Sequence, residues 1–194
     1  MAKPVNRMPP LYILRHGETD WNATGRLQGR FDSPLTQRGV AQAKAQNSIL
    51  GRHDLAGFKA ISSPQGRAFR TAEIALEGVC ADIQTDARLS EIGLGDWAGM
   101  DRGALIRSEK VRSGFDLYER APNGEGFDVL YARCDAFLGT LTGPSVLVTH
   151  GITSRMLRVI LLGKSLAELR KIEGGQGIVF YLENRVQKLL RERA

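Results

Sequence analysis

Short apolar runs that alternate with longer helical patterns are the feature that most constrains the fold of this chain. The run at residues 11–14 is followed directly by Arg15 and His16, and the run at 145–149 by His150. Apolar runs of this length are typical of buried strands, and strands that alternate with helices are typical of an α/β sandwich with a mostly parallel central sheet. Ligands of such sheets bind beyond the carboxyl ends of the strands, so we expect these polar residues to meet in one crevice.

These patterns cover most of the 194 residues and predict three layers in a single domain, residues 1–194. Thr36 is predicted to cap the helix over 36–50, and Tyr131 counts among the apolar positions of the helix over 125–141. Residues 88–116 are less regular and predict a loop followed by one short helix. Further strands are expected at 59–63, 178–182 and 186–190, with a turn at Glu183-Asn184, and further helices at 66–76, 151–162 and after the capping box 165–168.

The composition indicates an ordinary globular protein. Hydrophobic residues make up 42% and charged residues 25% of the chain, as in most water-soluble domains. Cys80 and Cys134 lack CxxC spacing, which favours reduced thiols. The first ten residues carry charges without an apolar stretch, and no apolar run approaches the roughly 20 residues of a membrane span. We therefore expect a cytoplasmic protein that makes no contact with a membrane.

The formal net charge of +6 fits either a nucleic acid or a small anion as the partner. Nucleic-acid binding surfaces typically combine a basic stripe with aromatic side chains. Aromatic residues make up only 7% of this chain, and lysine and arginine are scattered along it. The charge pattern therefore favours a small anion over nucleic acid.

Two of the three histidines occupy equivalent places in the pattern. His16 and His150 each follow an apolar strand and precede a glycine, whereas His53 lacks this context and is assigned to the surface. One such histidine is most often structural, but two at equivalent corners indicate a function. Arg15 adds a fixed cation, and Gly17 is expected to let the backbone approach a ligand closely. No HExxH, HxH or Cys/His cluster is present, so we expect neither a metal nor another cofactor.

Two further segments supply an arginine and a carboxylate. Arg67 lies in the first turn of the helix expected at 66–76, beside an end that favours anions, whereas Arg70 lies farther along and is expected at the surface. Glu91 lies in a glycine-rich loop, where a carboxyl group is suited to protonate a leaving alkoxide. Taken alone, each is more simply explained as an exposed surface side chain.

These residues belong to five segments that together form a recognisable pattern. The segments are Leu14-Arg-His-Gly-Glu-Thr-Asp-Trp-Asn22, Arg30-Phe-Asp-Ser-Pro-Leu-Thr-Gln-Arg-Gly39, Ser62-Ser-Pro-Gln-Gly-Arg-Ala-Phe-Arg-Thr-Ala72, Leu89-Ser-Glu91 with Gly95-Asp-Trp-Ala-Gly99, and Val148-Thr-His-Gly151. In content and order they resemble the histidine phosphatase superfamily, also called the phosphoglycerate mutase-like family. The resemblance covers most of the chain and implies the sandwich fold of that family.

The resemblance also implies a role for each residue. His16 resembles the family's nucleophile, which forms a phosphohistidine, and His150 resembles the second histidine, which donates to the phosphoryl group. Arg15 and Arg67 resemble the arginines that clamp the phosphoryl oxygens, and Glu91 resembles the acid that protonates the leaving group. Positions near the substrate are matched by Asn22, Gln28, Thr36 and Gly151.

The nucleophilic role makes one further demand on His16. Imidazole is nucleophilic only when it is neutral, so the ring nitrogen that faces away from the substrate is expected to donate to a backbone carbonyl. Gly17 is a candidate for that acceptor, although the sequence does not identify it.

We therefore expect a phosphatase that hydrolyses a small phosphomonoester without a metal. The alternative is a cofactor-dependent phosphoglycerate mutase, and a weaker alternative is a non-catalytic phosphoryl-binding protein. Mutases of the family usually carry longer insertions around the substrate, which favours a phosphatase for this chain. The family often has Gly-Glu-Ser where this chain has Gly124-Glu125-Gly126, so the contact made there is not predicted.

Residues 100–126 are expected to form a cap that covers the substrate and sets its choice. The segment contains Arg102, Arg107, Lys110 and Arg112. A solvated helix face explains these four charges more simply than contact with a second anionic group of the substrate. The sequence identifies neither the natural substrate nor the oligomeric state, for which a homodimer stays among the alternatives.

Overall fold

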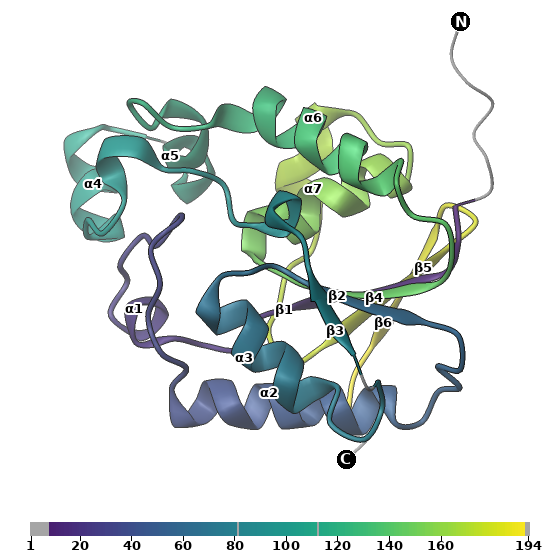
Figure 1. Cartoon of the computed structure of the whole chain (residues 1–194). Coiled ribbons are helices and arrows are strands. Elements are labelled where there is room, and N and C mark those ends of the chain that lie inside the picture. The colour runs from purple at the N-terminus through teal and green to yellow at the C-terminus, as the bar shows by residue number, and fades with distance from the viewer. Residues whose placement is uncertain (1–7, 81, 112, 193–194) are drawn as a thin grey trace, which may run out of the picture.

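A six-stranded sheet forms the middle layer of the structure, a computed structural model that describes residues 8–80, 82–111 and 113–192 (Figure 1). Its strands span Leu11–Arg15 (β1), Lys59–Ser62 (β2), Ile83–Thr85 (β3), Ser145–Thr149 (β4), Val179–Glu183 (β5) and Val186–Leu190 (β6). They lie in the order β3-β2-β4-β1-β5-β6. The first four of these neighbours run parallel, whereas β5 pairs antiparallel with β1, and β6 with β5. The prediction of a mostly parallel sheet is confirmed.

Three neighbouring parallel strands end level with one another. Leu14 of β1 and Ser62 of β2 both pair with Val148 of β4. The register continues by one residue, because the His16 N–H donates to the last carbonyl of β4 and the Ser63 N–H donates to the Val148 carbonyl, each at 2.9 Å. The residues that follow the three strands are therefore brought together at one edge of the sheet.

Helices cover both faces of the sheet. In Figure 1, α2 (Gln37–Leu50) and α3 (Gly66–Ala75) lie below the sheet, and α6 (Gly126–Leu138) and α7 (Gly151–Leu161) lie above it. These four helices confirm the predicted ones to within a few residues at each end, and the Thr36 hydroxyl caps α2 by accepting from the Gly39 N–H at 3.0 Å.

The strands are hydrophobic on both faces, which is what holds the two helical layers in place. Successive side chains of a strand point to opposite faces. Leu11 and Ile13 accordingly join the apolar cluster beneath α6 and α7, whereas Tyr12 and Leu14 join the cluster against α2 and α3. All four are buried.

The segment that links β3 to α6 differs from its prediction. The prediction of one short helix over 88–116 is wrong, because the structure has two there, α4 (Arg102–Ser108) and α5 (Gly114–Arg120). Asp101 caps α4 by accepting from the Ala104 N–H, so a local polar contact helps to define this helix. Both helices pack on a small apolar cluster that is separate from the two beside the sheet.

Other differences are smaller. The helix α1 (Asp20–Ala23) and the strand β3 were not predicted, and both are too short to show an apolar period. The last hairpin turns at Asn184 and Arg185, whose φ angles are 50° and 62°, and not at Glu183-Asn184. Tyr131 does not belong to the buried stripe of α6, because it lies at the edge of that stripe and is 38% exposed.

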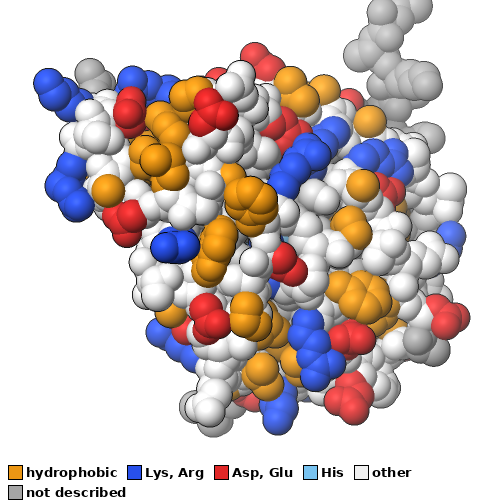
Figure 2. Space-filling model, turned by 60° about the vertical axis from the view of Figure 1, so that its left-hand side comes forward, with side chains coloured by type: hydrophobic (Ala, Val, Ile, Leu, Met, Phe, Trp, Pro, Cys, Tyr) orange, Lys and Arg blue, Asp and Glu red, His pale blue; other side chains and the backbone are white. Residues whose placement is uncertain are grey.

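The remaining surface and thiol predictions can be compared directly. Cys80 and Cys134 are both free thiols, and burial raises the pKa of Cys134 to about 12. Among the helices of the described residues, none combines the length and apolar character that a membrane crossing needs. On the face in Figure 2, lysine and arginine side chains are scattered among acidic and hydrophobic ones.

Candidate active site

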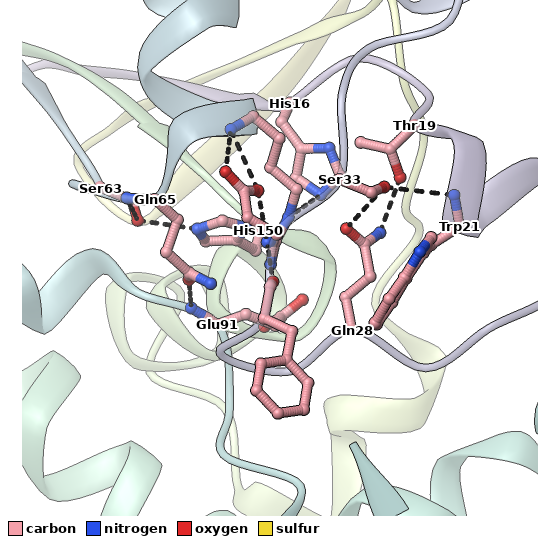
Figure 3. Close-up of polar contacts among 12 residues, drawn as sticks. His16, Thr19, Trp21, Gln28, Ser33, Ser63, Gln65, Glu91 and His150 are labelled. Carbon is pink, nitrogen blue, oxygen red and sulfur yellow. Dashed lines mark hydrogen bonds and ion pairs between the residues drawn. The ribbon is translucent and has the colours of Figure 1, made fainter. Parts of the chain in front are cut away.

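A cavity of about 200 Å³ opens beyond the carboxyl ends of β1 and β4. Arg15, His16, Arg67 and Glu91, which come from separate segments of the chain, all line it. His150 lies directly behind His16, with the two ring centroids 5.1 Å apart (Figure 3). The structure thus brings together all five side chains to which the sequence assigned the central roles.

His16 is held in one orientation by its backbone neighbour. It is 3% exposed, and its Nδ1 lies 2.7 Å from the Gly17 carbonyl oxygen. A carbonyl only accepts, so Nδ1 carries the ring proton and Nε2 keeps its lone pair. Burial, together with the charges of Arg15 and Arg67, holds the pKa of His16 well below its ordinary value. The ring is therefore neutral at neutral pH, as a nucleophilic imidazole must be.

His150 is oriented by Ser63, which lies on its far side (Figure 3). Its Nε2 lies 2.8 Å from the Ser63 hydroxyl, and that hydroxyl accepts from the Gln65 N–H at 3.3 Å. When the hydroxyl donates to Nε2, the imidazole proton lies on Nδ1. Nδ1 is buried and has no hydrogen-bond partner in the described part of the chain. Burial first, and then the charge of Arg67, lowers the pKa of His150 well below its ordinary value.

Arg67 is fixed from behind by three acceptors. Its Nη2 donates to the Gly29 carbonyl (2.9 Å), and its Nη1 donates to the Phe31 carbonyl (2.6 Å) and to Asp32 (3.0 Å). Asp32 also accepts from the Arg67 N–H at the start of α3. The Nε of the guanidinium points at Nε2 of His16, 3.3 Å away. A buried guanidinium held in this way faces the cavity with its charge already positioned.

Arg15 completes the ring of donors. Its Nε is buried and lacks a hydrogen-bond partner among the described residues. Gly151 separates this guanidinium from the acid: a Cβ at position 151 would lie 3.4 Å from the Arg15 guanidinium and 3.5 Å from Glu91 Oε2. Burial lowers the pKa of Arg15, and the nearby Glu91 raises it in part compensation. Arg15 Nε and His150 Nδ1 are therefore two buried nitrogens to which a bound anion could accept hydrogen bonds.

Glu91 lies at the start of α7 and is held there by several donors. Its Oε2 accepts from the Ile152 N–H (3.1 Å), and its Oε1 accepts from the N–H (3.1 Å) and hydroxyl (3.0 Å) of Thr153 and from the Ile92 N–H (3.1 Å). Gln65 anchors the loop itself by accepting from the Glu91 N–H at 2.7 Å. The first-turn N–H groups of a helix favour an anion, so the carboxylate has a defined position at the cavity wall.

The Glu91 loop has a second support, from the segment that departs from the family pattern. Glu125 accepts from the Gly93 N–H at 2.9 Å and forms an ion pair with Arg133. Arg133 in turn donates to the Arg88 carbonyl at 2.6 Å. In this chain Glu125 therefore acts as a brace for the loop that carries Glu91.

The four residues expected near the substrate divide into two groups. Asn22, Gln28 and Gly151 line the cavity. Thr36 does not: besides capping α2, its hydroxyl donates to Glu18 at 3.0 Å. Its contacts in the structure fix the start of α2.

Gly17 lies against the start of α2. A Cβ at this position would lie 2.2 Å from the Gly39 carbonyl oxygen. The missing side chain thus lets the backbone of α2 approach closely. This packing holds the loop that carries His16 against the helix.

Sequence reasoning missed several residues that orient the central five. Asp32 lies in one of the family-like segments, and Ser63 is the last residue of a predicted strand, so their positions gave a signal although their partners could not be predicted. Thr153 lies in the first turn of α7, and its hydroxyl donates to Glu91. Each acts on a residue far away in the chain, which a spacing pattern does not reveal.

The side chains of the site suit an anion better than a metal ion. Two arginines and two neutral imidazoles converge there with a single carboxylate. Elsewhere too, no group of three or more His, Cys, Asp or Glu side chains is placed to hold a metal, as far as the described residues go. A tetrahedral oxyanion could place one oxygen near each of Arg15, Arg67 and His150. Its central atom would then face Nε2 of His16.

Comparisons with known proteins agree with this geometry. A sequence model of the Histidine phosphatase superfamily (branch 1) matches residues 11–188. A relative from Proteus mirabilis, named "Probable phosphoglycerate mutase GpmB", is 37% identical over 166 residues, which are 80% of this chain and 76% of the relative.

Two solved structures share the fold. The mycobacterial glucosyl-3-phosphoglycerate phosphatase in complex with VO3 matches 96% of this chain and 100% of its own, with a TM-score of 0.78 and 28% identity. The alpha-ribazole phosphatase from Shigella flexneri matches 95% of this chain and 96% of its own, with a TM-score of 0.79 and 24% identity, and is evidence for the fold alone.

Proposed function

The chain belongs to the histidine phosphatase superfamily, and on that basis we propose that it hydrolyses a small phosphomonoester through a phosphohistidine on His16. The observation that carries the proposal is the state of His16. The Gly17 carbonyl fixes the proton on Nδ1, so Nε2 keeps its lone pair, which accepts from Arg67 Nε at 3.3 Å beside the cavity that both residues line. Arg15 and His150 each carry a buried nitrogen that has no hydrogen-bond partner in the described part of the chain.

In the first step, Nε2 of His16 attacks phosphorus as the bond to the leaving oxygen breaks. The guanidinium groups of Arg15 and Arg67 and the Nδ1–H of His150 bind the equatorial oxygens, whose charge they stabilise. Glu91, in its protonated form, gives its proton to the leaving oxygen. The products of this step are the free alcohol, a phosphorylated His16 and the Glu91 carboxylate.

In the second step, water attacks the phosphohistidine. Glu91 takes a proton from the water as the new P–O bond forms and the P–N bond breaks. Inorganic phosphate is released, His16 recovers its lone pair, and Glu91 is protonated for the next cycle. All charges that the phosphoryl group needs come from side chains of this chain, so the scheme uses no metal ion.

We also propose that residues 100–126 act as the substrate cap of a single domain. Arg102, Phe115 and Tyr118 belong to this segment and line the cavity opposite His16. The small size of the cavity favours a metabolite over a macromolecule as the phosphorylated partner, since sites for drug-sized ligands are roughly 300–1,000 Å³.

A phosphoglycerate mutase is the second candidate, and the name of the Proteus mirabilis relative favours it. A mutase uses the same central residues but returns the phosphoryl group to a sugar acid and not to water. Incubation with 3-phosphoglycerate separates the two functions: a phosphatase releases inorganic phosphate, whereas a mutase forms 2-phosphoglycerate. Binding of phosphate with no turnover of any ester would indicate the non-catalytic alternative.

The test is the His16→Ala variant. We expect hydrolysis of p-nitrophenyl phosphate to fall at least about 10³-fold, since the nucleophile is lost. Wild-type enzyme quenched during turnover of the radiolabelled ester should carry an acid-labile label that the variant lacks, and activity should survive excess chelator. His53→Ala is the matched control, because His53 is exposed and outside the cavity. Near wild-type turnover by His16→Ala would refute the proposal.

A further inference from the structure

The cavity contains more positive charge than a phosphoryl group needs. Among the described residues that line it, five are arginines and only Glu91 is a carboxylate. We propose that the substrate carries a second anionic group, a carboxylate or a second phosphate, that binds to Arg102 and Arg155 beside Tyr118. This inference rests on the proposed function and narrows its substrate class.

The arginines differ in what already balances their charge. Arg67 is paired with Asp32. Within the described part of the chain, none of the other arginines of the cavity forms an ion pair with a carboxylate: Arg15, Arg26, Arg102 and Arg155. The single charge of Glu91 acts on Arg15, Arg67 and Arg155 together. A phosphoryl group bound to Arg15 and Arg67 would therefore leave positive charge at Arg26, Arg102 and Arg155 without a full counter-charge.

Arg155 lines the cavity and is held in place by backbone carbonyls. Its Nε donates to the Ile172 carbonyl (2.9 Å) and its Nη1 to the Gly151 carbonyl (3.1 Å). The guanidinium also lies over the Phe115 ring, 5.4 Å from its centroid. Burial and the nearby charges of Arg15 and Arg102 lower the pKa of Arg155, an electrostatic cost that an anion would relieve.

Arg102 comes to the cavity from the cap. It is the first residue of α4, and its guanidinium lies against the backbone of Gly114, where a Cβ would come 2.0 Å from Nη2. The absence of a side chain at position 114 thus leaves room for the charge. Tyr118, one turn into α5, lies within electrostatic reach of Arg102, Arg15 and Arg155. Its phenol adds a neutral hydrogen-bond donor to the wall of the same cavity.

The other basic residues of the cap are placed differently. Arg107 and Lys110 are exposed and do not line the cavity, and Arg112 lies outside the described residues. The solvated helix face therefore explains Arg107 and Lys110, whereas Arg102 belongs to the site. A guanidinium binds the two oxygens of a carboxylate or phosphate with parallel N–H groups, which makes either anion suitable.

Three esters that share a glycerol skeleton test the inference. Glycerol 3-phosphate is the reference, 3-phosphoglycerate adds a carboxylate, and glycerol 1,3-bisphosphate adds a phosphate. At constant ionic strength we expect kcat/KM for at least one of the two esters with a second anionic group to exceed that of glycerol 3-phosphate about tenfold or more. For the symmetric bisphosphate this increase is counted beyond the factor of about two that its two equivalent phosphates provide. Loss of 3-phosphoglycerate is counted whether it ends as inorganic phosphate or as its isomer.

Two variants locate the effect. Arg102→Gln should lower the preference for the second anion about tenfold, toward equal kcat/KM for the esters. Arg107→Gln removes the same charge from the same helix and should leave the preference unchanged. Equal kcat/KM for all three esters with wild-type enzyme, or an equal loss of preference in both variants, would overturn the inference.

A failure of the proposed function has a separate signature. In that case p-nitrophenyl phosphate and all three esters are stable with the wild-type protein. The site for the second anion is then tested by calorimetric titration of the protein with the same esters. Tenfold tighter binding of an ester with a second anionic group than of glycerol 3-phosphate supports the inference. Equal or undetectable binding of all three esters overturns it.

Discussion

The phosphoryl-binding residues at the strand ends and the cap residues across the cavity are built in opposite ways. His16, Arg67 and His150 are almost completely buried, and backbone carbonyls or neighbouring side chains fix each of them. Arg102, across the cavity, is exposed and has no ion-pair partner in the described chain. Contacts within the protein therefore hold the strand-end residues in position, whereas no ion pair of the described residues holds Arg102.

The difference between the two regions matches two tasks, phosphoryl transfer and recognition of the rest of the substrate. Phosphoryl transfer depends on exact placement of donors around phosphorus, so its residues profit from burial and from preformed hydrogen bonds. Recognition of the remainder of a substrate requires free donors at the rim. Variants in the two regions should therefore differ in kind: those at the strand ends change rate and stability, and those in the cap change substrate choice.

The largest effect is expected from Glu91→Gln. The variant cannot protonate the leaving oxygen, so kcat/KM for glycerol 3-phosphate, which reports only the first step, should fall about 10²- to 10⁴-fold. Nitrophenolate leaves readily without a proton, so kcat/KM for p-nitrophenyl phosphate should fall much less. The measurement is kcat/KM for both esters with wild-type and variant enzyme, since kcat also contains the second step, in which Glu91 acts on water for either ester.

The comparison of the two esters is its own control. Damage to the fold or to the position of α7 would slow both reactions by the same factor, because the same protein acts on both. An equal loss would therefore contradict the role of Glu91 as the acid and would leave it a role in holding α7.

The next effect is on stability and follows from the two buried histidines. In the unfolded chain each ring binds a proton below about pH 6.5, whereas in the folded protein His16 and His150 have a pKa well below that value. The unfolded state thus takes up protons first as the pH falls, and stability falls with it. From pH 7 to pH 5.5 the two rings together should lower the free energy of unfolding by about 2.5 kcal/mol.

Urea unfolding at the two pH values measures this loss. The variant His16→Gln should lose only about half as much, near 1.3 kcal/mol, because one titrating ring remains. His53→Ala should behave as wild type, since that side chain is exposed. Equal unfolding free energies of the wild type at both pH values would show that the two rings titrate normally.

The strand ends and the cap also differ in how well the sequence predicts them. The strands β1, β2 and β4 and the residues that follow them were predicted correctly, because a buried strand and its polar end are both local patterns. The parallel pairing that brings His16, Ser63 and His150 together then follows from the fold class. The hydrogen-bond partners of the site residues could not be predicted. Asp32 contacts Arg67 across 35 residues of chain, and Ser63 contacts His150 across 87 residues.

The cap was predicted less well for a physical reason. Helices α4 and α5 have seven residues each, too few for an apolar period to stand out. Which of Arg102 and Arg107 faces the cavity depends on how α4 packs against the rest of the chain, and the charge pattern of a single helix does not contain that information. The sequence predicted both a helix cap and a place near the substrate for Thr36; the cap is confirmed, and Thr36 does not line the cavity.

The smallest effect is expected from Arg102→Gln on stability. An exposed side chain without a hydrogen bond or ion pair contributes little to folding, so the free energy of unfolding should change by less than about 0.5 kcal/mol. Arg67→Gln should instead lose about 2 kcal/mol, because it leaves the Gly29 and Phe31 carbonyls without their donor. Urea unfolding of both variants at pH 7 measures the difference. If Arg102→Gln destabilised the protein as much as Arg67→Gln, its charge would be part of the fold, and a loss of substrate preference in that variant could not be attributed to a lost contact with the ligand.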